Sequence, residues 1–263
     1  DYLNWMYENL MAIKSIMSEK SSIWVHLDFN IGHYVKVLMD EVFGEQNFLN
    51  EIIWHYENKP QFGFQNNFPR NFDTLFWYSI GEDTQTYNFE LVPVKEVQHQ
   101  AVVAWDPILK KRIAKRDENG NIIYEERTEK YLGSVWNIGM VHPKGNERVD
   151  YSTQKPQALL ERIIKCSSNE FRDENKTQKT IVADFFGGSG AFAFAANRNN
   201  RIFIHCDIGI NSIQTTRDRL KEEGASFQIL EIKDGVSLFR NPQQTMDKLA
   251  KLIPGLQRNV AGI

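Results

Sequence analysis

The chain has 263 residues, of which 41% are hydrophobic and 25% are charged, and its formal net charge is −3. These values are typical of a globular chain with one domain and an insertion, and they exclude a basic field over the whole molecule. The two cysteines, Cys166 and Cys206, form no disulfide framework and lack the spacing of metal ligands. We therefore expect no metal site and a reducing, cytoplasmic setting. No apolar run is long enough to predict a membrane span.

The first eighty residues alternate between amphipathic helices and strands. Apolar residues recur every three or four positions over about 2–18, which predicts a helix. A strand is expected at 23–28, and the helix that follows it should end at Gly44. Two further strands, 51–56 and 73–79, are expected to pair as a hairpin joined by a long loop.

That long loop is a first candidate for contact with nucleic acid. Between Tyr56 and Phe72, aromatic side chains are interleaved with Lys59 and Arg70. Such a mixture can stack on bases while it neutralises phosphates. A small core beneath the loop explains the same aromatic residues equally well, so both interpretations stay open.

Residues 80–150 lose the alternation of helices and strands and are interpreted as an insertion. Within it, Glu118–Asn121 carries an Asn-Gly turn signal that predicts a hairpin. A cationic run precedes this turn: Lys110, Lys111, Arg112, Lys115 and Arg116. Such side chains supply sequence-independent affinity for phosphates, so the run is a candidate DNA contact. The alternative is a solvated charge run that the acidic residues after it balance.

After Pro156 the alternation of helices and strands returns. The pattern predicts helices and strands in the order helix 157–167, strand 180–184, helix 190–197, strand 201–207, helix 210–222 and strand 226–232. The tail has little pattern, and one more helix is expected over Met246–Leu252.

The most informative segment is the turn Asp184-Phe-Phe-Gly-Gly-Ser-Gly190, between strand 180–184 and the next helix. Gly188 and Gly190 can adopt positive φ, and the helix directs free N–H groups toward a ligand. Asp207 ends the following strand, 19 residues after Gly188, where a carboxylate can accept hydrogen bonds from a ribose diol. The turn predicts a nucleoside cofactor and, taken alone, fits NAD and S-adenosylmethionine equally. A turn that binds nothing is the third interpretation.

The segment Tyr151-Ser-Thr-Gln-Lys-Pro156, followed by a helix and then by this glycine turn, resembles the β-group of amino-DNA methyltransferases. This family modifies adenine N6 or cytosine N4 and includes the modification subunits of type III restriction systems. The resemblance covers roughly 1–80 and 133–235. It also includes four N-terminal segments: Tyr2–Tyr7, Ile23–Asp28, Asp40–Phe48 and Asn50–Trp54.

The resemblance implies an α/β, S-adenosylmethionine-dependent methyltransferase fold, with a mostly parallel doubly wound sheet and a β-hairpin edge. It divides the chain into four parts. They are a catalytic-side half (1–79), an inserted target-recognition region (80–150), a cofactor-binding half (151–235) and a C-terminal tail (236–263).

The resemblance also assigns two groups of residues to S-adenosylmethionine. Its methionine and ribose part would contact the glycine turn and the strand end, at Phe186, Gly188, Gly190 and Asp207. Its amino-acid end would lie in a pocket formed by Thr153, Lys155 and Pro156. The alternatives are that Asp207 caps a strand end and that Lys155 is a solvated lysine.

One part of the family pattern is absent from the sequence. The catalytic tetrad Asp/Asn-Pro-Pro-Tyr/Phe/Trp, which ends strand 4 of the family's sheet, occurs nowhere in residues 1–263. The nearest strings begin at Asp106-Pro107 and Asn241-Pro242, and both lack the second proline and the aromatic residue. The catalytic residues are therefore unknown. We expect an upstream segment or a companion chain to supply the missing central strand 4.

The resemblance thus implies a DNA methyltransferase that uses S-adenosylmethionine and acts on double-stranded DNA, with adenine N6 favoured by its frequency in the family. A restriction-modification system is its expected setting, with a restriction subunit as a further partner. Two other classes stay open. The missing tetrad favours a catalytically silent DNA- or cofactor-binding subunit, and the glycine turn alone favours an NAD-dependent oxidoreductase.

Overall fold

The computed structural model describes residues 2–59, 66, 68–149, 151–232 and 242–252. The chain separates into two compact units. The smaller unit, Phe89–Gly133, lies within the predicted insertion 80–150. The larger unit combines Asp1–Asn88 with Ser134–Ile263, so both ends of that insertion belong to it.

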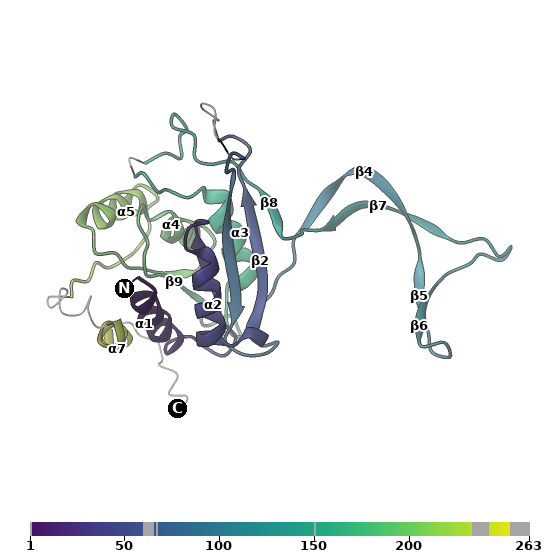
Figure 1. Ribbon diagram of the computed structural model, residues 1–263, viewed down its shortest axis with the longest axis horizontal. Helices are drawn as coiled ribbons and strands as arrows, with labels where there is room; N and C mark the ends of the chain where they lie inside the picture. Colours follow the sequence, from purple (N-terminus) through teal and green to yellow (C-terminus); the bar gives the residue numbers. More distant parts are fainter. Residues whose placement is uncertain (1, 60–65, 67, 150, 233–241, 253–263) are drawn as a thin grey trace. The chain divides into compact units, whose positions relative to one another are not determined.

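The larger unit contains a four-stranded sheet in the order β1-β3-β2-β8 (Figure 1). Its strands are β1 (Ser22–Leu27), β3 (Phe72–Ser79), β2 (Phe48–His55) and β8 (Val135–Asn137). Strand β3 is antiparallel to both of its neighbours, and β8 is parallel to β2. The predicted hairpin pair is therefore confirmed.

Helices α1 (Tyr2–Lys14) and α2 (Gly32–Phe43) contribute apolar side chains that pack with one face of this sheet. Leu10 of α1 and Met39 of α2 are fully buried in this core. Burying each such side chain contributes about 1.5–3 kcal/mol. The β3 residue Tyr78 is also buried, and its hydroxyl donates a hydrogen bond to Asp40 at 2.5 Å. Helix α1 ends at Lys14, before the predicted residue 18, because the backbone turns at Ser15 and Ile16.

The opposite face of the four-stranded sheet carries tryptophans. Alternate residues of a strand point to the same face, and the register pairs Trp24 with Trp77 and Trp54 with Trp136. The Trp24 and Trp77 rings stack with centroids 4.7 Å apart. Helix α3 (Gln157–Ser167) meets this face where the Arg162 guanidinium lies 5.4 Å from the Trp136 ring.

A second sheet of the larger unit consists of β9 (Ile181–Asp184) and β10 (Ile202–His205), which pair in parallel. Helix α4 (Ala191–Arg198) connects them, and α5 (Ile210–Glu222) follows β10. Ile164 of α3 packs on Ala195 and Ala196 of α4. The small alanines allow this close approach of two helices. All these elements lie within a residue or two of the predicted bounds.

Helix α7 (Pro242–Leu252) includes the predicted helix over Met246–Leu252, and its Met246 and Leu249 pack against Ala12 of α1. The short 3-10 helix η1 (Glu45–Asn47) follows α2. Among the described residues, no helix has the length and apolar character needed to cross a membrane.

The described strands of the larger unit form two separate sheets, and no described strand lies between β1 and β9, where a central strand was expected to be missing. The parallel pairs are β2–β8 and β9–β10, so the four-stranded sheet is mixed. The predicted strand 226–232 is wrong. Residues 226–232 form no strand, because no neighbouring strand pairs with their backbone groups. Among the described strands, β1 pairs only with β3 and β9 pairs only with β10, so each presents one unpaired edge.

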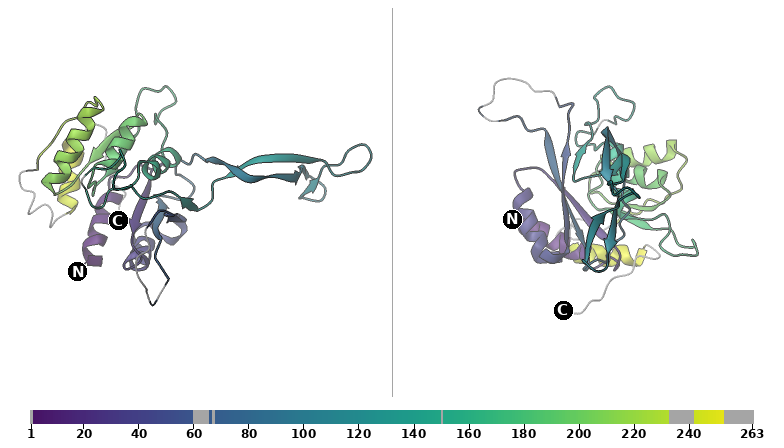
Figure 2. Two further views of the ribbon diagram at one scale, coloured as in Figure 1. Left: turned by 90° about the horizontal axis from the view of Figure 1, so that it is seen from above. Right: turned by 90° about the vertical axis from the view of Figure 1, so that its right-hand side faces the viewer.

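The smaller unit is built from two antiparallel strand pairs (Figures 1 and 2). Strand β4 (Leu91–Ala101) pairs with β7 (Tyr124–Tyr131), and β5 (Val103–Asp106) pairs with β6 (Lys111–Ala114). The predicted turn before β7 is confirmed, since Asp117 N–H donates to the Asn121 carbonyl at 2.8 Å. No residue of this unit is buried. Isolated two-stranded pairs are at best marginally stable in water, so this unit gains little from a core of its own.

Candidate functional site

The glycine turn between β9 and α4 requires its glycines for two separate reasons. Gly188 and Gly190 have φ values of +50° and +73°, which side chains rarely allow. A Cβ atom at Gly190 would also lie 2.2 Å from the Thr216 hydroxyl. Gly187 has no unusual φ, but a Cβ there would lie 2.0 Å from Nδ1 of His205. The turn is therefore packed directly against β10 and α5.

Asp207 holds this turn from the end of β10. Its Oδ2 accepts a hydrogen bond from Gly188 N–H at 2.8 Å, and its Oδ1 accepts one from Gly209 N–H at 2.7 Å. Each carboxylate oxygen can accept more than one hydrogen bond, so capacity remains for hydroxyl donors. The structure thus brings together two residues that the sequence assigned to one cofactor.

A polar cluster beneath the turn fixes it further. Nε2 of His205 lies 3.2 Å from the hydroxyls of both Ser212 and Thr216. The Ser212 hydroxyl in turn donates to the Gly188 carbonyl. Burial lowers the pKa of His205 below its ordinary value, and the nearby Asp207 only partly opposes this effect. A neutral imidazole therefore supports the glycine turn near neutral pH.

The segment before α3 runs beside the same turn. Its buried Gln154 accepts a hydrogen bond from Val149 N–H at 2.8 Å and donates one to the Glu147 carbonyl at 2.7 Å. These bonds fix the backbone on either side of Tyr151. A Cβ at Gly188 would lie 3.2 Å from the Tyr151 ring, so the ring packs on the glycine turn. Two motifs that are far apart in sequence therefore form one site.

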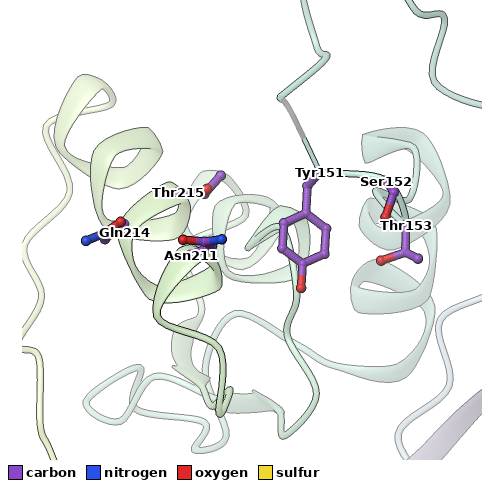
Figure 3. A pocket seen from close by; sticks show the side chains of 6 residues that line it. All are labelled: Tyr151, Ser152, Thr153, Asn211, Gln214 and Thr215. Carbon is purple, nitrogen blue, oxygen red and sulfur yellow. The ribbon is translucent and has the colours of Figure 1, made fainter.

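A polar pocket of about 530 Å³ opens between this segment and α5. Its lining residues are Tyr151, Ser152, Thr153, Asn211, Gln214 and Thr215 (Figure 3). The volume is in the range of small-molecule sites. Among these residues only Thr153 was assigned to the site from sequence. The three α5 residues follow Asp207 at i, i+3 and i+4 spacing, a polar helix face that could have indicated them.

Lys155 lies between carboxylates of the two sheets rather than in solvent. Its Nζ donates to the Thr153 carbonyl at 3.2 Å. Burial lowers the pKa of Lys155, while Asp73 of β3 and Asp184 of β9 act in the opposite direction. Burial likewise raises the pKa of Asp184, although the Phe186 N–H that it accepts opposes the shift. The lysine is thus a partly desolvated cation near one carboxylate of each sheet, Asp73 at the start of β3 and Asp184 at the end of β9.

A second polar pair faces Lys155 from the four-stranded sheet. His26 of β1 and Asp73 of β3 are 3.0 Å apart. Burial alone would raise the pKa of Asp73, but the His26 hydrogen bond and nearby cations outweigh it and lower that pKa. The Asp73 carboxylate and the Tyr56 hydroxyl are 3.5 Å apart, and burial together with Asp73 raises the pKa of Tyr56 to about 12. No pattern in the sequence indicated that these residues lie near the site.

The two remaining predicted cofactor residues lie before α3 and in the glycine turn. Pro156 is buried and precedes the first turn of α3 with φ −61°. Phe186 is 52% exposed, and its ring meets Trp5 of α1 with centroids 5.6 Å apart. An exposed aromatic surface therefore borders the glycine turn, with α1 on one side of it.

The predicted DNA-contact residues of the smaller unit are all exposed: Lys110, Lys111, Arg112, Lys115 and Arg116. Lys111 and Arg112 are neighbours in β6, so they point to opposite faces. Arg116 donates to the Gly120 carbonyl at 2.6 Å within the following turn.

In the loop Tyr56–Phe72, residues 60–65 and 67 lie outside the described residues, and so do the aromatic residues Phe62 and Phe64. Of the rest, Arg70 stacks on the exposed Phe29 ring, with the guanidinium 3.4 Å from the ring centre. Phe68 is 94% exposed, so this residue is not part of a small core.

Similarity to known proteins shows the family of this chain. A family model described as "DNA methylase", for N6 and N4 methyltransferases, matches residues 1–218. The chain belongs to this DNA methylase family.

Two named relatives are distant from this chain in sequence. The Type II methyltransferase M.HpaI of Haemophilus parainfluenzae is 24% identical over 230 residues, which are 88% of this chain and 63% of that protein. The DNA adenine methyltransferase YhdJ of Escherichia coli (strain K12) is 23% identical over 225 residues, 83% of this chain and 67% of its own length. The chain therefore spans less than two thirds of the length of M.HpaI.

Among solved structures, the M1.HpyAVI–SAM complex is similar with a TM-score of 0.54 and 19% identity. The match covers 82% of this chain and 83% of that one. At 19% sequence identity, this similarity shows the fold alone.

Proposed function

We propose that this chain forms the cofactor-binding and DNA-binding part of a methyltransferase. It would transfer a methyl group from S-adenosylmethionine to an exocyclic amine of a DNA base. The observation that carries this proposal is the contact between Asp207 and Gly188 beside the Tyr151–Pro156 segment. Family membership supports DNA as the substrate.

In this proposal the cofactor contacts both motifs. The ribose hydroxyls donate to Asp207, whose oxygens keep acceptor capacity beyond the two backbone N–H groups. Gly188, Gly190 and Phe186 contact the ribose and methionine part. Thr153, Lys155 and Pro156 surround the amino-acid end, where the Lys155 cation suits its carboxylate. The SAM present in the M1.HpyAVI complex supports this choice.

Methyl transfer requires hydrogen-bond acceptors for the base amine. In the family the tetrad Asp/Asn-Pro-Pro-Tyr/Phe/Trp supplies them, and residues 1–263 contain no such tetrad. The amine nitrogen attacks the methyl carbon, the carbon–sulfur bond breaks, and a proton leaves the nitrogen for an acceptor. An amine conjugated to its ring is a poor nucleophile, so acceptors must hold its N–H groups, and the base must first leave the helix. We propose that a further strand with these groups pairs with the unpaired edges of β1 and β9. An upstream segment or a companion chain would supply it.

Adenine N6 is the proposed target, and the adenine activity in the name of YhdJ supports it over cytosine N4. The exposed cations from Lys110 to Arg116 would contact phosphates of duplex DNA. A restriction-modification setting, with a restriction subunit as a further partner, is supported by the Type II relative M.HpaI.

A second candidate is a catalytically silent subunit that binds the cofactor or DNA. The absence of the tetrad from the sequence favours it. The silent subunit would bind the cofactor or DNA without methyl transfer, so the two candidates differ in methyl transfer.

One set of experiments tests both candidates. Calorimetry should detect S-adenosylmethionine, and binding of NADH without S-adenosylmethionine would contradict the proposal. A tritiated-methyl assay on duplex DNA should detect no transfer by residues 1–263 alone and should detect transfer once the strand with the tetrad is restored. No transfer by the restored protein would favour the silent subunit. Mass spectrometry of the methylated nucleosides would distinguish adenine from cytosine.

A further inference from the structure

The β5–β6 hairpin ends in a turn whose apolar side chains are uncovered. Ile108 is 89% exposed and Leu109 is 57% exposed. Trp105, at the end of β5, is 62% exposed. Single exposed apolar residues are common, whereas neighbouring ones can together offer an apolar surface to a partner. These residues belong to a unit that has no buried residue to pack against.

The turn that carries these side chains is preorganised. Oδ1 of Asp106 accepts hydrogen bonds from Ile108 N–H at 2.8 Å and from Leu109 N–H at 2.9 Å. Lys110 then adopts φ +47°, which closes the turn so that Lys111 pairs with Asp106 across the strands. The apolar pair is therefore presented at the tip in one conformation, which lowers the entropy cost of inserting it into a partner.

The charges around the tip indicate what that partner is. Between Trp105 and Arg116 the sequence has five cations, and Asp106 is the single acidic residue. Three of the cations, Lys110, Lys111 and Arg112, directly follow the apolar pair. A partner that complements this surface has dense negative charge outside and apolar faces inside, as duplex DNA does. A tip-to-tip contact with a second copy would bring like charges together.

We propose that Ile108 and Leu109 enter the base stack of duplex DNA from the minor groove as a wedge, while the cations after them contact the flanking phosphates. Apolar side chains of this kind partly unstack a base step and kink the duplex in known minor-groove complexes. The inference rests on the proposed DNA-binding function and adds a distortion of the helix to it. A wedge of this type would also reduce the stacking that opposes base extrusion.

The test uses relaxed circular plasmid, which needs no knowledge of a recognition sequence. The plasmid is bound by the full chain, treated with topoisomerase I and freed of protein, and its topoisomers are separated on a gel. Unstacking a base step unwinds the helix, so the wild type should shift the distribution. The double variant Ile108→Ser with Leu109→Ser should lose most of the shift at equal occupancy. Val97→Ser, which changes a 52% exposed residue of β4, is the matched control and should keep it.

Each outcome separates the wedge from the proposed function. An unchanged shift in the double variant would overturn the wedge, as would DNA binding by the wild type without any shift. In both cases the proposed DNA binding would stand. No binding of the plasmid by the wild type would end both proposals. Sedimentation of the same variants gives the last outcome: loss of a dimer in the double variant, with the topoisomer shift unchanged, would assign the tip to a second copy.

Discussion

The Asp207 carboxylate accepts a hydrogen bond from Gly188 N–H at 2.8 Å, so the end of β10 fixes the turn that follows β9. One side chain thereby stabilises the turn and remains available to a ligand. The cofactor site and the local fold depend on the same carboxylate.

Asp207→Ala should therefore weaken S-adenosylmethionine binding by about tenfold or more, because unpaired polar groups cost roughly 1–3 kcal/mol. Isothermal calorimetry measures the dissociation constant. The control is Asp218→Ala, since Asp218 lies on the exposed side of α5 and pairs with Arg217. An unchanged dissociation constant in the Asp207 variant would remove this residue from the site.

Replacing Gly190 tests the close packing of the turn. Gly190→Ala and Gly224→Ala both place a side chain at positive φ, but only at Gly190 does the new Cβ meet another residue, Thr216. Gly224→Ala should cost about 1–2 kcal/mol from φ alone. Gly190→Ala should cost roughly 1–3 kcal/mol more because of overpacking. Urea denaturation compares the free energies of unfolding, and equal losses would contradict the packing argument.

The half-buried His205 predicts a pH dependence of stability. Its pKa in the folded state lies below the ordinary value of 6.5, so the unfolded chain binds a proton more readily. This contribution to the free energy of unfolding should be complete above pH 6.5 and should decline as the pH falls below it. His205→Asn should show less decline between pH 7.5 and 5.5, while His33→Asn, which changes an exposed residue of α2, should resemble the wild type. Equal declines in all three proteins would disprove the assignment.

The cationic run predicts a salt effect on DNA binding. Neutralising Lys110, Lys111 and Arg112 to Gln should weaken binding of all duplex sequences alike and reduce the slope of log K against log salt by about 0.9 per lost phosphate contact. Fluorescence anisotropy at several salt concentrations measures this slope. Lys176→Gln with Lys179→Gln, two exposed lysines of the larger unit, is the comparison. If the slope is unchanged, the run is a solvated charge face.

Local patterns in the sequence were sufficient to place most of the helices and to associate Gly188 with Asp207. Apolar periodicity predicted α3 at its observed bounds, and spacing alone joined Gly188 to Asp207. Pairing between strands was not predictable in the same way. Residues 226–232 have a strand-like pattern but no partner, because a pattern reports which face is apolar and not which strand lies beside it.

Asp73 was missed for the same reason. It comes from a strand far earlier in the chain, and its charge opposes the lowering of the Lys155 pKa, so only the folded chain brings the two residues near each other. The Tyr151 ring likewise packs on Gly188 from another motif. The polar α5 residues that line the pocket follow Asp207 at helical spacing, so the sequence could have indicated them. They were missed because polar residues on a helix usually face solvent.

The lack of any buried residue in Phe89–Gly133 has a consequence for how this protein can change. Substitutions in a core are limited by packing, whereas those in this unit affect mainly whatever it contacts. The two strand pairs can therefore accept new side chains, or be exchanged for those of a relative, with little effect on the melting of the larger unit. Selection on partner choice can act on these 45 residues almost independently of selection on folding.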